Sequence, residues 1–241
     1  QVILVSIKMT KINKIKISRE TLRGWFKQET IPYKMRKKRP HRNWRERKHQ
    51  FGQMIQADGS HHRWFEERDP ECVLMGYIDD ANNNVFARFY DTEGTLPFMD
   101  SFKRYVKRYG LPQSVYIDRH SAYKANNKPA IEDELNNREP QSQVQRALKE
   151  LEVELIYAYS APAKGRIERL FRTFQDRLVK EMRLKNIKSI KDGNKFLAHY
   201  LPIHNKRFKV EPIEKGDLHR PLLKNMDIDR ILCIKTERGL N

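Results

Sequence analysis

Three carboxylates stand at positions from which they can hold a metal ion. Asp58 and Asp118 are each expected at the end of a short apolar strand, and Glu168 lies one position beyond the apolar stripe of an expected helix. Carboxylates at strand ends can converge at one edge of a sheet, where their oxygens suit hard cations such as Mg²⁺ or Mn²⁺. Two such ions about 4 Å apart can activate a water or hydroxyl and stabilise a leaving oxygen. These residues therefore predict a two-metal phosphoryl-transfer site.

The spacing alone does not choose Asp58 over its neighbours Asp79 and Asp80. Both of these residues end the second expected strand, and there turn formation is the simpler interpretation. His120, close to Asp118, is a candidate for contacting a phosphate or orienting that carboxylate, as a histidine can do near neutral pH. The alternatives stay open on spacing alone.

Zinc and disulfide chemistry are not expected. Cys72 and Cys233 are isolated in the sequence and form no Cys-x-x-Cys motif, so they are expected to be reduced thiols. With His204 and His219 they also lack the spacing of a zinc motif. No run of eighteen apolar residues is present, so a soluble, intracellular protein without a membrane span is expected.

The elements that must position the carboxylates alternate along the chain. Strands are expected over residues 53–58, 72–79, 85–90, 114–118 and 153–157, the first three as an antiparallel meander with short connections. Helices are expected over 96–109, 143–151, 164–184 and 190–200. The third of these helices has an apolar stripe at helical spacing, formed by Ile167, Leu170, Phe171, Phe174 and Leu178. This order of elements predicts an α/β fold.

The formal net charge of +18 is distributed unevenly over the 241 residues. Residues 1–50 carry a net +13, residues 51–160 a net −5, and residues 161–241 a net +10. Dense Lys and Arg favour a polyanionic partner, because each neutralised phosphate releases a condensed counterion. The acidic middle contains Asp58 and Asp118, where bound cations would offset the negative charge. Nucleic acid is therefore the expected partner.

The N-terminal segment contains a short amphipathic helix over residues 17–26, with Ser18 as its expected N-cap. The expected inward face consists of Leu22, Trp25 and Phe26. The opposite face carries Arg19, Arg23 and Lys27. This pattern is typical of the recognition helix of a helix-turn-helix, although an ordinary amphipathic helix fits it equally well.

Four segments resemble the catalytic core of bacterial insertion-sequence transposases, which belong with the retroviral-integrase-type DDE enzymes. They are residues 56–60 (QADGS), 77–81 (YIDDA), 116–121 (YIDRHS) and 163–169 (AKGRIER), and the resemblance runs from about residue 44 to 222. It implies a ribonuclease-H-like fold, with a mixed five-stranded sheet flanked by helices. It also implies that Asp58, Asp118 and Glu168 are the metal-binding triad, holding two Mg²⁺ ions.

The resemblance also suggests how the chain is divided. The expected parts are a partial helix-turn-helix remnant (1–31), a basic linker (32–50), the catalytic core (51–185) and a C-terminal extension (186–241) truncated before a β-rich domain. The spacing from Asp118 to Glu168 exceeds that of retroviral integrases, and a polar insertion at 124–142 accounts for the surplus. Because only the last, recognition-like helix of a helix-turn-helix is expected and the β-rich domain is missing, the chain is expected to be a fragment or decayed copy.

By resemblance, the activity would be metal-dependent cleavage and strand transfer at the ends of an insertion sequence. The partners would be double-stranded DNA and further copies of the chain, in the cytoplasm and associated with the bacterial nucleoid. Besides the basic face of the N-terminal helix, the expected DNA contacts are Lys37, Lys38, Arg39, Lys164, Arg166, Arg169 and Arg172. The alternatives are a non-catalytic DNA-binding protein and a ribonuclease-H-like nuclease acting on RNA or RNA–DNA hybrids.

Overall fold

The computed structural model describes residues 16–31, 46–118, 141–158 and 165–236. The chain divides into two compact units, Gln1–Asn43 and Trp44–Asn241. No helix in the described ranges is both long and apolar enough to cross a membrane. The four-part division expected from the sequence stays a prediction.

The first unit contains helix α2 (Arg19–Gln28). Ser18 is its N-cap, as predicted, because the Ser18 Oγ accepts the amide of Thr21 at 3.0 Å. Leu22 is buried, but the prediction that Trp25 faces inward is wrong, since Trp25 is 48% exposed. Trp25 lies at the margin of the apolar stripe, whose centre falls between Leu22 and the half-buried Phe26. The helix-turn-helix stays a prediction, because residues 1–15 lie outside the described part.

The second unit is built on a mixed sheet of five strands with the order β3-β2-β1-β4-β5. The strands are β1 (Ile55–His62), β2 (Cys72–Asp79), β3 (Val85–Tyr90), β4 (Ser114–Ile117) and β5 (Glu154–Tyr157). The first three pair antiparallel, whereas β4 runs parallel to both β1 and β5. The predicted ribonuclease-H-like α/β sheet, with its antiparallel meander, is therefore confirmed.

Strand β1 is longer than predicted, and this changes the position of Asp58. The strand continues to His62, so Asp58 lies within it, opposite Gly76 of β2, and not at its end. The predicted strand ended at residue 58 because the next two residues, Gly59 and Ser60, have low strand propensity. Asp118 directly follows β4, as predicted.

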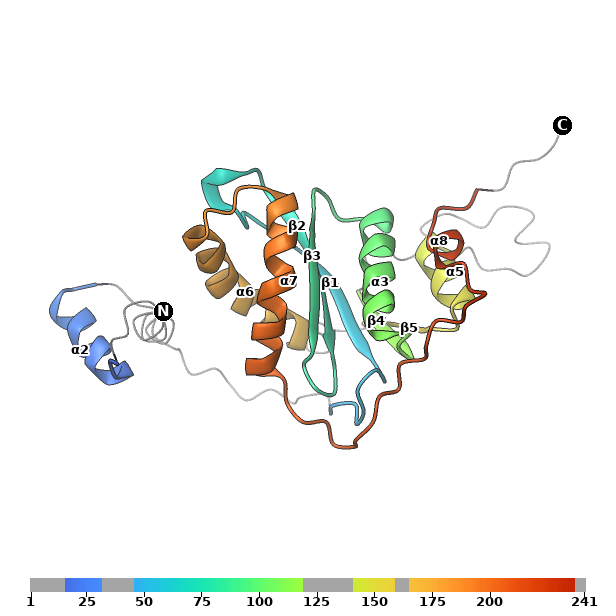
Figure 1. Ribbon diagram of the computed structural model, residues 1–241, viewed down its shortest axis with the longest axis horizontal. Coiled ribbons are helices and arrows are strands. Elements are labelled where there is room, and N and C mark those ends of the chain that lie inside the picture. Colours follow the sequence, from blue (N-terminus) through green and yellow to red (C-terminus); the bar gives the residue numbers. More distant parts are fainter. Residues whose placement is uncertain (1–15, 32–45, 119–140, 159–164, 237–241) are drawn as a thin grey trace. The chain divides into compact units, whose positions relative to one another are not determined.

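Different helices cover the two faces of the sheet (Figure 1). One face packs against α3 (Thr95–Tyr109) and α5 (Gln143–Glu150), and the other against α6 (Gly165–Leu184) and α7 (Ile190–Phe208). Because successive side chains of a strand point to opposite faces, β2 supplies both cores and is buried along its whole length. The expected helices on both faces are confirmed.

Helix α7 covers the outer edge of the sheet at β3. The Asn205 amide pairs with both backbone groups of Val85, at 2.9 Å each. Asn194, three turns earlier on the helix, pairs in the same way with Phe89, at 2.8 and 3.0 Å. These hydrogen bonds satisfy an edge strand that would otherwise present unpaired backbone groups to another chain.

The same helix extends further than its sequence predicts. The expected helix ends near residue 200, but α7 continues to Phe208 with Pro202 inside it. Proline cannot donate a backbone hydrogen bond within a helix, which is why the sequence pattern indicated an end there. Burial of Leu201 and His204, on either side of Pro202, compensates for the missing bond.

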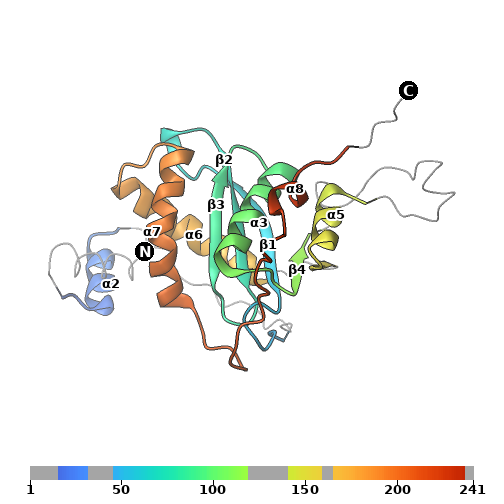
Figure 2. The ribbon, with the colours of Figure 1, turned by 45° about the vertical axis from the view of Figure 1, so that its right-hand side comes forward.

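After α7 the chain crosses the end of the sheet and returns to the α3 face (Figure 2). We call residues 210–232 the C-terminal strap. It pairs Arg220 with Leu111 in an antiparallel bridge and Asp217 with Phe51 in a parallel one. Its last turn, α8 (Ile228–Ile231), buries Ile228 in the core beneath α3 and α5. The strap thus runs around the end of the sheet where β1 and β4 begin and anchors in the core beneath α3 and α5.

A pH-dependent stability is expected from His204. Burial, followed by the Arg177 and Arg207 guanidiniums, lowers its pKa from 6.5 to about 4. At pH values between about 4 and 6.5 the unfolded state binds more protons at His204 than the folded state does, so the free energy of unfolding falls as the pH drops. Relative to His204→Phe, the wild type should lose about 1–3 kcal/mol of unfolding free energy between about pH 7 and pH 4. Urea denaturation of both proteins measures this difference, and a difference that does not change with pH would contradict it.

Candidate active site

The pairing of β1 with β4 brings two of the predicted carboxylates into the same register. Ile55 pairs with Val115 and Gln56 with Tyr116, each with an offset of 60 residues. The same offset relates Asp58 to Asp118, two residues further along each strand. Neighbouring strands lie about 4.8 Å apart, and side chains in register point to the same face. Asp58 and Asp118 therefore stand next to each other where β4 ends.

These carboxylates lie on the face of the sheet that α6 covers. Gln56, two residues before Asp58, accepts the amide of Ile167 at the start of α6, at 3.3 Å. Ser60, two residues after Asp58, accepts a long hydrogen bond from Gln175 of the same helix, at 3.4 Å. Because alternate residues of a strand share a face, Asp58 points between these two contacts, toward α6.

Glu168 lies on the stretch of α6 that begins this contact. It precedes Gln175 by two helical turns and so shares its side of the helix. Glu168 and Asp118 are exposed, whereas Asp58 is half-buried beneath the helix. The fold thus brings the carboxylate of α6 to the part of the sheet where the two strand carboxylates stand.

A glycine in β2 permits this close approach of the helix. A Cβ atom at Gly76, opposite Asp58, would lie 2.8 Å from the ring of Phe171 and 3.6 Å from Ile167. Both residues belong to the buried stripe of α6, as predicted. A side chain at position 76 would displace the Phe171 ring and disturb the packing of α6 on β2.

The donor set suits a hard divalent cation. Carboxylate oxygens are the ligands that Mg²⁺ prefers, and the exposure of Asp118 and Glu168 leaves room for the waters that Mg²⁺ retains. Among the residues that the structure describes, no three His, Cys, Asp or Glu side chains are already arranged as a set of metal ligands. The backbone therefore supplies the placement, and the side chains of Asp58, Asp118 and Glu168 would have to turn onto an ion.

Asp79 organises the turn after β2, as the sequence predicts. Its carboxylate accepts the amides of Ala81 and Asn82 at 3.0 and 2.9 Å, and that of Gly52 at 2.9 Å. Burial raises its pKa to about 6, although these hydrogen bonds act in the opposite direction. All of these contacts are to backbone, so Asp79 is a structural residue.

Asp80 is the centre of a buried polar cluster that the sequence did not reveal. Its Oδ1 accepts Gln56 Nε2 at 2.8 Å and Arg166 Nη1 at 2.9 Å, and its Oδ2 accepts the amide of Lys48 at 2.8 Å. Gln56 and Asp80 are fully buried. One sequence feature could have indicated this cluster: Gln56 is a polar residue among the apolar residues that begin β1. A buried polar side chain rarely lacks a hydrogen-bond partner, so Gln56 predicts one nearby.

The same cluster changes the interpretation of Arg166. The sequence places this residue among the DNA contacts, but its guanidinium is only 10% exposed and is paired with Asp80. Burial of an Arg requires such a partner. The Arg166 side chain is therefore largely buried and paired within the protein, where the sequence predicted a DNA contact.

Arg169 and Arg172, also predicted as DNA contacts, are exposed on α6 beside Glu168. Burial, and then the nearby charges of Arg47 and Arg172, lower the pKa of Arg169. Arg47 is held by the turn after β2, donating to the carbonyl of Ala81 at 3.1 Å. Three guanidiniums therefore gather at this end of α6 and make it electropositive. The sequence pattern did not indicate Arg47.

Several predicted site residues lie outside the part of the chain that the structure describes. They are His120, Lys164, Lys37, Lys38 and Arg39, together with the side chain of Arg19. Arg23 and Lys27 are exposed on α2, where Arg23 forms an ion pair with Glu20. Cys72 and Cys233 are free thiols, as predicted, and burial raises the pKa of Cys72 to about 12.

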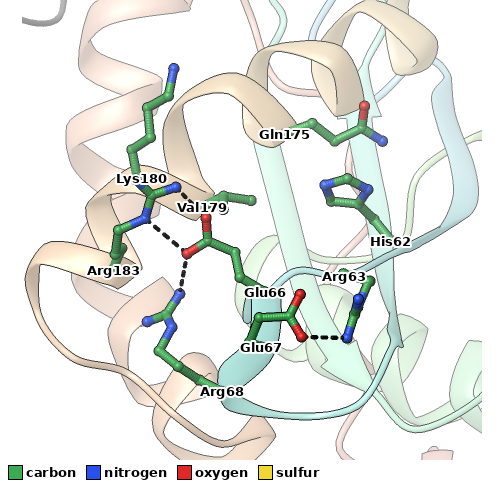
Figure 3. Close-up of a pocket in the computed structure, with 9 residues that line it drawn as sticks. All are labelled: His62, Arg63, Glu66, Glu67, Arg68, Gln175, Val179, Lys180 and Arg183. Carbon is green, nitrogen blue, oxygen red and sulfur yellow. Dashed lines mark hydrogen bonds and ion pairs between the residues drawn. The ribbon is translucent and has the colours of Figure 1, made fainter.

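A cavity of about 680 Å³ lies between the β1–β2 connection and the second half of α6 (Figure 3). Its lining comprises His62, Arg63, Glu66, Glu67, Arg68, Gln175, Val179, Lys180 and Arg183. Glu66 pairs with Arg183 and with Arg68, and Arg63 pairs with Glu67. Since the cations are engaged with protein carboxylates and no predicted catalytic carboxylate lines the cavity, we do not assign it to the active site.

The sheet order, the helices on both faces and the adjacent strand carboxylates define an α/β protein of the ribonuclease-H-like class. No model of a known protein family matches the chain. A chain of the simian T-cell lymphotropic virus intasome in complex with PP2A regulatory subunit B56 gamma has a related fold, with a TM-score of 0.51 at 14% identity. That match covers 81% of this chain and 66% of the other.

Two curated proteins are similar in sequence. "Putative transposase y4bF" of Sinorhizobium fredii is 36% identical over 239 residues, which is 98% of this chain and 51% of that protein. "Transposase for insertion sequence IS1202" of Streptococcus pneumoniae is 30% identical over 167 residues, 68% of this chain and 34% of that protein. The predicted resemblance to insertion-sequence transposases is confirmed. The chain spans about half the length of the first relative and a third of the second.

Substitution at Gly76 tests the packing of α6. Gly76→Ala should lower the free energy of unfolding by about 1–3 kcal/mol, because its Cβ overlaps the Phe171 ring. The control is Gly24→Ala in α2, where a Cβ meets nothing within 4 Å and helix propensity favours alanine. Urea denaturation measures both. Equal stability of the wild type and Gly76→Ala would show that α6 does not need the close approach.

Proposed function

We propose that the chain contains the catalytic core of an insertion-sequence transposase, which cleaves DNA at the ends of the element and joins those ends to target DNA. The sequence similarity to two transposases supports this function. The structural observation that carries the proposal is the offset of 60 residues in the β1–β4 pair, which aligns Asp58 with Asp118. The helix that carries Glu168 packs on the same face of the sheet.

In this proposal Asp58, Asp118 and Glu168 hold divalent metal. Bound Mg²⁺ or Mn²⁺, as a pair of ions, would supply Lewis acidity for the attacking oxygen and for the leaving oxygen of the phosphodiester. The chain itself contributes positioning and charge. β1 and β4 hold two of the carboxylates rigidly, and α6 provides the third. No covalent intermediate with a protein side chain is needed, because phosphoryl transfer depends mainly on positioning and electrostatic stabilisation.

The basic residues would hold the DNA backbone. Arg169 and Arg172, with Arg47 beside them, would place phosphates next to Glu168. In the N-terminal unit, Arg23 and Lys27 are exposed on α2 and would provide a separate contact with DNA. The net +13 of residues 1–50 supplies the long-range attraction to a polyanion. Further copies of the chain would assemble on the DNA, since two DNA ends must be held together for joining.

Loss of one carboxylate tests the enzymatic proposal. Asp58→Asn should reduce Mg²⁺-dependent nicking of supercoiled plasmid DNA by at least about 100-fold, because a metal-ligand oxygen is replaced by a neutral amide. Asp118→Asn and Glu168→Gln should reduce nicking to a similar extent. The matched control is Glu67→Gln, an exposed carboxylate on another element that should retain wild-type nicking.

The same assay separates this function from its alternatives. Wild-type nicking rates in Asp58→Asn would indicate a non-catalytic DNA-binding protein. Hydrolysis of RNA–DNA hybrids, with no DNA joining product, would indicate a nuclease. Strand joining that requires all three carboxylates is the result expected of a transposase.

Salt dependence tests the DNA-binding surface. The affinity for duplex DNA should fall by about 100-fold between about 50 and about 200 mM salt if several phosphates are contacted. Arg172→Gln should reduce the log–log slope by about one. Lys195→Gln, an exposed position on α7 paired with Asp192, should leave the slope unchanged. Fluorescence anisotropy provides the measurement, and a flat salt response would rule out backbone contacts.

A further inference from the structure

The most complete buried polar structure beside the candidate site is the cluster of Gln56, Asp80 and Arg166. Asp80 Oδ1 receives both Gln56 Nε2 and Arg166 Nη1, at 2.8 and 2.9 Å. Gln56 Oε1 accepts the amide of Ile167, at 3.3 Å. The cluster therefore joins three elements: β1, the turn after β2 and the first turn of α6.

Each end of this cluster lies two residues from a carboxylate of the proposed site. Gln56 precedes Asp58 on the same face of β1, and Arg166 precedes Glu168 in the first turn of α6. A displacement of the cluster at either end is therefore a displacement of one carboxylate relative to the other.

The apolar stripe of α6 cannot by itself set this alignment. Apolar contact is non-directional, and a helix can slide or rotate on a sheet with modest loss of buried area. Hydrogen bonds depend on distance and angle, so they define one position. A buried ion pair also contributes little net stability compared with apolar residues of equal volume, and its best-attested use is to fix a register.

We infer that Gln56, Asp80 and Arg166 form a positioning cluster, which fixes the first turn of α6 so that Glu168 faces Asp58. The inference rests on the proposed function for the role of the two carboxylates. The cluster residues touch neither metal nor DNA in this scheme. They act through the residues that do.

The experiment compares Arg166→Met with Arg166→Lys in the full chain. In Arg166→Met the Mg²⁺ concentration for half-maximal nicking of supercoiled plasmid DNA should rise at least tenfold, because Glu168 is no longer held toward Asp58. Lysine keeps a positive charge on Asp80, so Arg166→Lys should stay within about threefold of the wild type. Lys180→Met, which removes the Lys180–Asp176 pair from the same helix, is the matched control and should not change the Mg²⁺ dependence.

Hydrogen exchange provides a readout that does not depend on activity. The Ile167 amide lies in the first turn of α6, where helical partners are lacking, so its bond to Gln56 accounts for its protection. In Gln56→Leu, which leaves no buried charge unpaired, the amide of Ile167 and the helical amides of the next turn, residues 169–172, should exchange at least tenfold faster. In the wild type they should stay protected.

The possible outcomes separate the two proposals. If the wild type nicks DNA and Asp58→Asn does not, an unchanged Mg²⁺ dependence in folded Arg166→Met overturns the positioning cluster and leaves the proposed function standing. If Asp58→Asn nicks DNA like the wild type, the proposed function fails. Unchanged hydrogen exchange in Gln56→Leu overturns the positioning cluster whatever the nicking assay shows. The exchange experiment also tests the cluster if Arg166→Met does not fold.

Discussion

The position of α6 against the sheet depends on the absence of a side chain at residue 76. The ring of Phe171 occupies the space that a Cβ atom would take. Because of this close approach, the first turn of α6 reaches β1, where Ile167 donates its amide to Gln56. The approach brings the first turn of α6, which carries Glu168, to the face of the sheet on which Asp58 and Asp118 lie, so the candidate site depends on how this helix packs on the sheet.

Two adjacent acidic residues at the end of β2 illustrate how the fold uses buried charge. Asp79 satisfies backbone amides of the following turn and of Gly52, while Asp80 receives side chains from β1 and α6. Burial of an acid is unfavourable unless its oxygens accept hydrogen bonds, and both residues meet this condition. The acidic middle of the sequence therefore includes structural carboxylates, Asp79 and Asp80, as well as the half-buried Asp58 and the exposed Asp118 of the candidate site.

Polar side chains of α7 cover the edge strand β3, and the C-terminal strap covers one end of the sheet. Asn194 and Asn205 of α7 satisfy the backbone of β3, and the C-terminal strap bridges to Phe51 and Leu111 at the end of the sheet. These contacts keep β3 from pairing with another chain. Asp118, directly after β4, is exposed, as the proposed contact with a DNA backbone requires.

Local pattern in the sequence was sufficient for the order of elements, for most strand bounds and for the stripe of α6, because alternation and helical spacing are properties of neighbouring residues. The motifs also indicated Asp58, Asp118 and Glu168. The sequence placed Asp58 at a strand end and Arg166 on the DNA surface. Only the tertiary structure showed that Asp58 lies within β1 in register with Asp118, and that Arg166 turns inward to Asp80. Strand register and buried ion pairs join residues far apart in the chain, so they are decided by packing and not by local pattern.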